Sequence, residues 1–173
     1  MTNLFQSRGS MISRFRALPS WEQKWLIQTV CWLPVVVILL RLLGLRRCVS
    51  LGGRTSKVVG AEVWVETAGY QQVDRVDRAA LLTAAAARHG LARGTCLSRS
   101  LTLWWMLRSR GIQGSLRIGV RKPHQRLEAH AWVEYEDRIL GDSSAVRLKF
   151  IPIGTWGDRQ IVSDVLAVGD RAL

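Results

Sequence analysis

Cysteine is scarce in this sequence, with three residues in 173, at Cys31, Cys48 and Cys96. No two of them have the CxxC spacing of a zinc ligand pair, and the sequence has neither an HExxH segment nor a secretory pattern. An odd number of cysteines in this arrangement supports neither a disulfide framework nor a structural zinc site. We therefore expect a protein of the reducing cytoplasm that uses no metal ion and no cofactor.

Acidic residues are also few, 13 Asp and Glu against 25 Lys and Arg, which gives a formal net charge of +12. The imbalance is concentrated in residues 1–57, where Glu22 is the only acid. Such a charge is compatible with nucleic acid, an anionic membrane or an acidic partner. The sequence contains no motif that reads RNA or DNA, so we expect no nucleic-acid partner.

The longest apolar run is short. It extends from Trp25 to Leu40 and meets Arg41 after 16 residues, whereas a membrane-spanning helix needs about 20. Basic residues flank it on both sides, so the charge asymmetry that orients a span is missing. Three alternatives stay open for this stretch: packing on the rest of the chain or on a partner, which we favour, then an interfacial membrane helix, then a span.

We predict one helix over residues 21–45, kinked at Pro34, because proline removes a helical N–H donor. Membrane contact, if it occurs, would involve this helix. The chain is too short for two comfortable domains. We therefore divide it into a basic, apolar N-terminal helical arm over residues 1–57 and one compact domain over residues 58–173.

The C-terminal part begins with two predicted helices. The first starts near Asp74, runs through an alanine-rich stretch and stops at Gly90. The second opens at Cys96 and stops at Gly111. Cys96 therefore lies in the first turn of a helix, where exposed amides and the helix dipole favour thiolate over thiol. The thiolate is the nucleophilic form.

Beyond these helices the spacing of apolar residues changes from the helical period of 3.6 residues to a period of two. Leu116, Ile118 and Val120 alternate with polar residues and predict a strand. Further strands are expected over residues 127–135, which include His130, and over residues 138–142. The predicted class is α+β, with a cysteine-bearing helix packed on an antiparallel sheet.

A nucleophile on a helix, followed by a His and a carboxylate on adjacent antiparallel strands, is typical of papain-like and transglutaminase-like enzymes. Cys96 would be the nucleophile, His130 the general base and acid, and Asp142 the residue that orients the imidazole. The Cys96 amide would supply one oxyanion donor, and the second donor is unassigned. Taken singly, each of the three also has a structural interpretation, as a buried thiol, a packed histidine or a turn residue.

The hairpin between the last two strands imposes a geometric condition. A strict two-residue turn at Glu136-Asp137 would put His130 and Asp142 on opposite faces of the sheet. A three-residue loop over residues 135–137, or an irregularity at Gly141, would bring them together. We expect one of these to exist.

Two further residues are candidates for the surroundings of the site. Trp132 lies two residues after His130, so it shares the same strand face and either fills the core or walls the substrate cleft. Arg99 lies one helical turn after Cys96, either as a solvated residue or as a clamp near the site.

Three segments carry a family resemblance: RGTCLSRSLTLWWMLRSRGI (93–112), EAHAWVEYEDRILGD (128–142) and the apolar helix that ends in RLLGLRR. Together they resemble the leader peptidases of lasso peptide biosynthesis in their standalone, split form. The resemblance covers residues 12–153 and is most specific in the spacing of Cys96, His130 and Asp142.

The resemblance implies a cysteine protease that removes the leader of a ribosomally made precursor peptide. A separate cyclase would then join the freed amine to an Asp or Glu side chain. It also implies a separate leader-recognition protein, because fused family members carry that domain at the N-terminus and this chain has a helical arm there instead. Two alternatives remain: an acyl transferase of the transglutaminase type, and a non-enzymatic basic module that binds membrane or nucleic acid.

Overall fold

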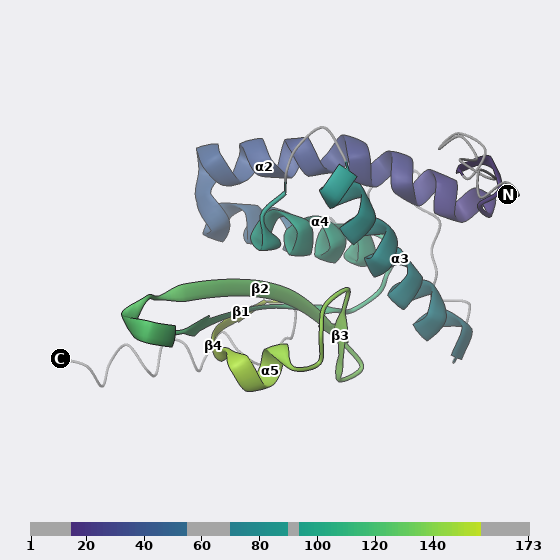
Figure 1. The fold of residues 1–173 in the computed structure, drawn as a ribbon. Helices are drawn as coiled ribbons and strands as arrows, with labels where there is room; N and C mark the ends of the chain where they lie inside the picture. The colour runs from purple at the N-terminus through teal and green to yellow at the C-terminus, as the bar shows by residue number, and fades with distance from the viewer. Residues whose placement is uncertain (1–14, 55–69, 90–93, 157–173) are drawn as a thin grey trace, which may run out of the picture.

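The computed structural model describes residues 15–54, 70–89 and 94–156. In it, a layer of three helices covers one face of a four-stranded antiparallel sheet, and a short helix lies on the opposite face (Figure 1). The expected α+β class is confirmed. The elements, in chain order, are α2 (Ser20–Arg54), α3 (Tyr70–His89), α4 (Cys96–Arg108), β1 (Ser115–Arg121), the 3-10 turn η1 (Pro123–Gln125), β2 (Glu128–Tyr135), β3 (Arg138–Leu140), α5 (Val146–Lys149) and β4 (Ile151–Trp156).

Helix α2 consists of two helical segments that meet at Gly44, whose φ of 74° and ψ of 169° are not helical. A positive φ costs glycine little, because it has no Cβ. The second segment turns back beneath the first (Figure 1). The predicted kink at Pro34 is wrong, since the direction of the chain changes at Gly44 and the helix continues to Arg54.

The inner face of α2 packs on α3 and α4. Trp25 is fully buried, and its indole Nε1 donates to Thr83 Oγ1 at 2.9 Å. Arg78 on α3 donates to the Glu22 carboxylate through Nε and Nη2, each at 3.0 Å. Residues of both α2 segments therefore belong to the same hydrophobic core as α3, α4 and the sheet. The domain boundary predicted near residue 57 lies outside the described residues and stays a prediction.

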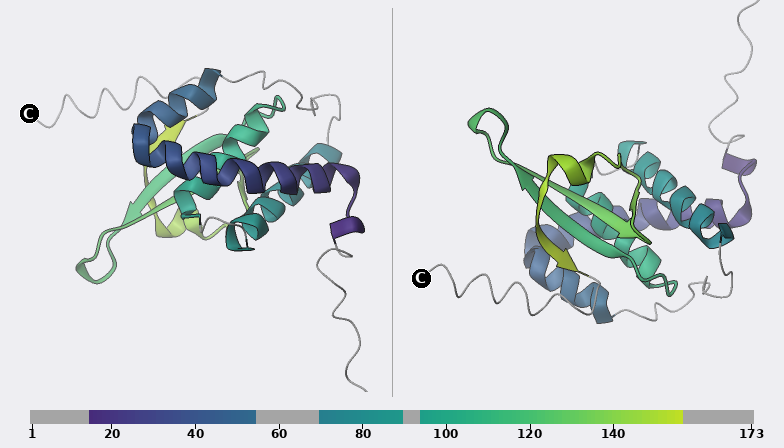
Figure 2. Two further views of the ribbon diagram at one scale, coloured as in Figure 1. Left: turned by 90° about the horizontal axis from the view of Figure 1, so that it is seen from above. Right: turned by 90° about the horizontal axis from the view of Figure 1, so that it is seen from below.

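The sheet has the order β3-β2-β1-β4 (Figure 2). Leu116 of β1 with Val133 and Tyr135 of β2 belong to the helical core. Because side chains alternate along a strand, Trp132 and Glu134 face the other side, where α5 lies.

The first two predicted strands are confirmed within a residue or so, and the third ends at Leu140 rather than Asp142. Strand β4 was not predicted. Its IPIGTW sequence contains Pro152, and a proline is tolerated there because β4 is an edge strand.

Candidate active site

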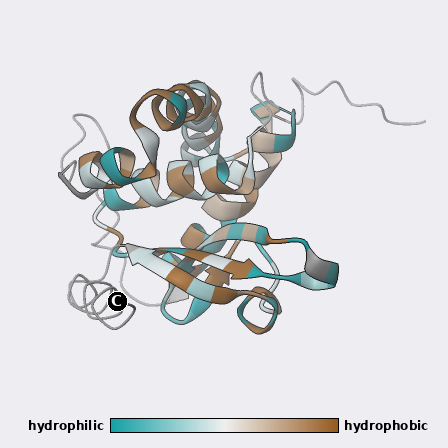
Figure 3. Ribbon diagram, turned by 90° about the vertical axis from the view of Figure 1, so that its left-hand side faces the viewer, coloured by the Kyte–Doolittle hydropathy of each residue, from teal (hydrophilic) through white to brown (hydrophobic). Residues whose placement is uncertain are grey.

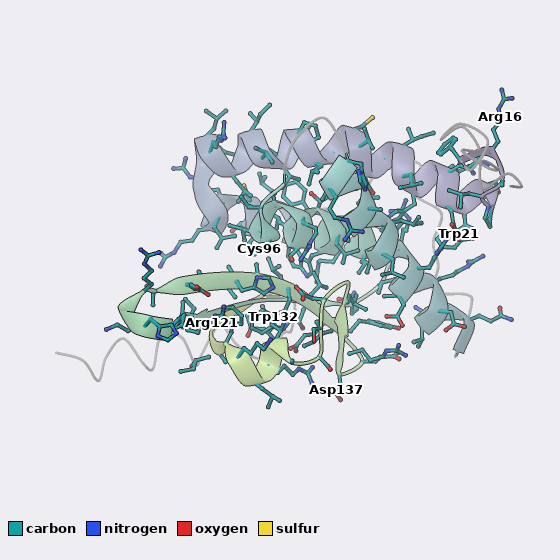
Figure 4. All side chains as sticks on the ribbon, in the orientation of Figure 1. Arg16, Trp21, Cys96, Arg121, Trp132 and Asp137 are labelled. Atoms are coloured by element: carbon teal, nitrogen blue, oxygen red, sulfur yellow. The ribbon has the colours of Figure 1, made fainter. Side chains whose placement is uncertain are left out.

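Cys96 is the first residue of α4, as predicted. The helix begins there because Thr95, in an extended conformation, caps it: the Thr95 hydroxyl accepts a hydrogen bond from the Ser98 amide at 3.3 Å. The Cys96 side chain is half-buried and lies where the start of α4 approaches β2 (Figure 4). The first amides of a helix have no acceptor within it, so the Cys96 N–H is suited to bind a negatively charged oxygen.

His130 on β2 and Asp142 after β3 form a hydrogen-bonded pair. The imidazole Nε2 lies 2.7 Å from Asp142 Oδ2, and the other carboxylate oxygen accepts from the Ser143 amide at 2.8 Å. Since Nε2 is engaged by the carboxylate, Nδ1 is the ring nitrogen left to exchange a proton with another group. The acid therefore fixes the orientation of the imidazole and selects its free nitrogen.

The electrostatics of Asp142 follow from these contacts. Partial burial raises the pKa of the carboxyl group, but the hydrogen bonds from His130 and Ser143 and the charges of His130 and Arg99 outweigh it. The pKa of Asp142 is therefore lowered, and the group stays ionised at neutral pH. An ionised acid can stabilise a positive charge on His130.

The β2–β3 hairpin has a strict two-residue turn. Tyr135 pairs with Arg138, and the turn residues Glu136 and Asp137 have φ of 46° and 61°, which fits a type I′ turn. The three-residue loop over 135–137 that we considered is therefore absent. In this register, a continued strand would keep Asp142 on the face opposite His130.

Gly141 resolves this geometric conflict. The β2–β3 ladder ends at Leu140, and Gly141 has a φ of 66°, in the left-handed region that glycine enters readily. The strand alternation no longer constrains Asp142, and its carboxylate reaches His130. The expected irregularity is present at Gly141, as a bend that ends the strand rather than a bulge within it.

Arg99 connects the cysteine-bearing helix to this pair. Its guanidinium lies 3.2 Å from Asp142 Oδ2, the same oxygen that binds His130. Of the two interpretations left open by the sequence, the clamp is the one observed. Residues three apart on a helix are neighbours, so Cys96 lies within one turn of a residue that contacts the acid. No hydrogen bond joins the described side chains of Cys96 and His130.

Trp132 belongs to the packing beside His130. The two rings stack with centroids 6.3 Å apart and planes at 19°, and Trp132 is 1% exposed. Its Nε1 donates to Glu134 at 2.8 Å. Trp132 therefore packs against the His130 ring and is too buried to contact a substrate, so it does not form a wall of the substrate cleft.

Phe150 is a neighbour of the site that sequence reasoning missed. Its ring stacks on His130 with centroids 5.2 Å apart, and the Arg121 guanidinium lies 4.8 Å from the Phe150 ring centroid. It lies between α5 and β4, beyond the last predicted strand, and no motif surrounds it.

Among the residues that the structure describes, no group of three or more His, Cys, Asp or Glu side chains is placed to hold a metal ion. The side chains of the proposed triad are a thiol, an imidazole and a carboxylate. These groups suit nucleophilic acyl transfer.

Comparison with known proteins gave one match. The sequence profile described as the transglutaminase-like superfamily matches residues 39–155, more than half of the chain. No curated protein and no solved structure matched. The matched region contains α4, the sheet except its last residue Trp156, and each residue of the site described above. The chain therefore belongs to the transglutaminase-like superfamily, whose members are usually cysteine-based enzymes.

Proposed function

We propose that this protein is a cysteine peptidase that removes the leader segment from a ribosomally synthesised lasso peptide precursor. The observation that carries the proposal is the His130–Asp142 hydrogen bond of 2.7 Å, joined through Arg99 to the helix that begins at Cys96. Cysteine enzymes activate their nucleophile with a helix N-terminus and an oriented imidazole, and this chain carries both features.

The reaction would proceed in two acyl transfers. In the first, His130 Nδ1 takes the thiol proton, and Cys96 Sγ attacks the last carbonyl carbon of the leader. The C–N bond breaks, a thioester forms, and the imidazolium gives its proton to the departing amine of the core peptide. In the second, His130 removes a proton from water, the hydroxide attacks the thioester, and the leader leaves as a carboxylic acid while Cys96 recovers its proton.

Two kinds of interaction would lower the barriers. The Cys96 amide donates to the oxyanion of each tetrahedral intermediate. Asp142, ionised because its pKa is lowered, stabilises the imidazolium that forms transiently. Arg99 acts on Asp142 and not on the substrate, so it is a positioning residue.

The substrate assignment rests on the resemblance of segments 93–112 and 128–142 to split leader peptidases. A cleft that reads only a few residues around the cut cannot select one precursor, so a separate recognition protein would bind the upstream leader and present the bond. Such tethering raises the effective concentration of the cleavage site to about the millimolar range. The freed core amine would then pass to a separate cyclase in the cytoplasm.

Mass spectrometry of products tests this function. The purified protein is incubated with a precursor peptide, with and without the recognition protein. A peptidase yields a leader and a core whose masses sum to the precursor plus one water. Release should be slow with this chain alone and much faster with the recognition protein.

The same mass measurement distinguishes a peptidase from an acyl transferase, the other activity considered for this superfamily. A transglutaminase-type acyl transferase would join the acyl group to an amine and yield one product lighter than its reactants by ammonia or by the leaving amine. That product would overturn the peptidase assignment. Full-rate, leader-selective cleavage by this chain alone would remove the need for a recognition protein.

A further inference from the structure

The outer face of α2 carries an apolar stripe. Ile27, Val35, Ile38 and Leu42 are between 41% and 74% exposed, and Cys31 is exposed as well. Spacings of three and four residues place all five on one side of the helix. We call this set the α2 stripe. Its Cα atoms extend over about 22 Å along the helix axis, at 1.5 Å per residue.

On the opposite side of α2, the apolar residues Trp25, Leu33 and Val36 are buried. The helix is therefore apolar on two sides (Figure 3). Only 17% of its most apolar 18-residue window is buried. No described element covers the outer side of α2 (Figures 1 and 2). A contiguous apolar face of this kind on a protein surface marks a contact site with a membrane or with another molecule.

The charges beside the stripe indicate what covers it. The only acid in α2 is Glu22, which is 6% exposed and paired with Arg78. Exposed basic residues lie at both ends of the stripe, Lys24 before Ile27 and Arg41 next to Leu42, and Arg46 and Arg47 follow beyond Gly44. No charged residue lies between Lys24 and Arg41. Apolar side chains between cations, without an exposed acid, complement an anionic lipid surface.

Trp32 supports a lipid partner over a protein partner. It lies between the α2 stripe and the buried side of the helix, where its ring packs edge-to-face on Trp105 of α4 with centroids 6.3 Å apart, and it is 39% exposed. Tryptophan is enriched at the boundary between lipid headgroups and acyl chains, where its ring is partly apolar and partly polar. A protein interface of this length usually also carries polar groups that fix the partner's register, and the α2 stripe has none.

By length and composition, α2 is also the one described helix that could cross a membrane, over Ser20–Gly52. The packing argues against that arrangement. The Trp25–Thr83 hydrogen bond and the Glu22–Arg78 ion pair hold α2 against α3. Insertion across a bilayer would break both or bury them in lipid, at the cost of unsatisfied polar groups.

We propose that the α2 stripe rests in the headgroup region of an anionic membrane, with α2 parallel to the surface. In this orientation α3, α4 and the sheet lie on the water side, and the start of α4 stays accessible to a peptide. The inference does not depend on the proposed peptidase activity, which is measured separately in solution.

Cosedimentation with lipid vesicles tests the proposed contact between the α2 stripe and an anionic membrane. The full chain should bind vesicles of equal parts phosphatidylglycerol and phosphatidylcholine, and bind pure phosphatidylcholine far more weakly. The double variant Ile38→Asn/Leu42→Asn should lose about tenfold or more in affinity, because two exposed apolar anchors are removed. Both positions are exposed, so its thermal unfolding should match the wild type.

A matched control uses equally exposed apolar residues on another part of the surface. Leu148 on α5 is 91% exposed and Ile153 on β4 is 60% exposed, so Leu148→Asn/Ile153→Asn should bind vesicles as the wild type does. An environment-sensitive dye on Cys31, in the Cys96→Ala background, should shift toward the blue with anionic vesicles. Cys48 is fully buried and should not take the dye.

Several results would overturn the proposal. These are no binding to anionic vesicles, wild-type binding by Ile38→Asn/Leu42→Asn, or equal loss in the Leu148→Asn/Ile153→Asn control. Retention on vesicles through high salt and alkaline carbonate would indicate a spanning helix. If the Ile38→Asn/Leu42→Asn change abolished only stimulation by the recognition protein, the α2 stripe would be a protein interface instead.

Discussion

Arg99 on α4 lies 3.2 Å from Asp142 Oδ2, and this contact joins the helix that begins at Cys96 to the acid that orients His130. The nucleophile and the base come from different layers of the fold, α4 and the sheet. The layers are held together by a shared hydrophobic core, and the ion pair connects the helix directly to the acid. Four predictions follow from this arrangement and from the bend at Gly141.

The first prediction concerns Arg99. Arg99→Gln should lower kcat/KM by roughly tenfold, about the contribution of one hydrogen bond to a charged group. It should also raise the pKa of Asp142 toward its ordinary value, because one cation that lowers it is lost. Arg99→Lys keeps the charge and should recover part of both effects.

The lowered pKa of Asp142 determines how stability should depend on pH. A carboxyl group whose pKa is lowered in the folded state stabilises the fold above its unfolded pKa, and that contribution disappears as the pH falls through the folded value. In the wild type the loss should occur below about pH 4, the region of an ordinary Asp. In Arg99→Gln this contribution to stability should be smaller and should be fully lost at a higher pH than in the wild type, and the acid limb of kcat/KM should shift to higher pH. Identical pH profiles for the two proteins would show that Arg99 does not act through Asp142.

The second prediction ranks the three proposed catalytic residues. His130→Ala should reduce kcat/KM about as severely as Cys96→Ala. Asp142→Asn should retain about two orders of magnitude more activity than either, since an orienting acid contributes less than a nucleophile or base. His89 at the end of α3 and His124 in η1 are exposed and serve as controls. If His124→Ala were the inactivating change, the base would be misassigned.

The third prediction concerns the reactivity of the three thiols. Near neutral pH an alkylating agent should label Cys96 first, because it is the proposed nucleophile at the start of α4. Cys31 is exposed and should react as an ordinary thiol. Cys48 should react last, since it is buried and burial raises the pKa of its thiol. Peptide mapping of a time course gives the order, and faster labelling of Cys31 than of Cys96 would contradict it.

The fourth prediction concerns Gly141. Gly141→Ala places a Cβ on a residue with positive φ, which costs about 1 to 2 kcal/mol, and 3.3 Å from the Ala80 carbonyl oxygen. It should therefore displace Asp142 and lower kcat/KM as well as stability. Gly44→Ala is the matched control, because Gly44 also has a positive φ but nothing lies within 4 Å of the added Cβ. A similar loss of stability with unchanged activity is expected there. Equal kcat/KM for the two variants would exclude a role for the bend in placing Asp142.

Local patterns in the sequence were sufficient to predict much of the fold. The Gly94-Thr95-Cys96 segment predicted the start of α4 because capping is a local property. Alternation of apolar residues predicted β1 and β2 for the same reason. Strand β4 was missed since its apolar residues are exposed and interrupted by Pro152, so they lack the pattern of a half-buried strand.

Contacts between distant segments were harder to predict. The sequence placed Arg99 near Cys96, but its ion pair with Asp142 depends on how α4 packs against the end of β3. The direction of α2 depends on Gly44 rather than Pro34, and both residues break helices in isolation. Phe150 reaches His130 only because α5 folds back across the sheet.

The most direct test of the central claim is a single-turnover experiment with enzyme in excess over precursor, quenched in acid and read by intact mass and peptide mapping. A transient adduct equal to the leader's acyl group should form on Cys96, decay as free leader accumulates, and disappear with hydroxylamine. Neither adduct nor core peptide should form with Cys96→Ala. Release of core peptide by Cys96→Ala at the wild-type rate, or an adduct on any other residue, would contradict the account.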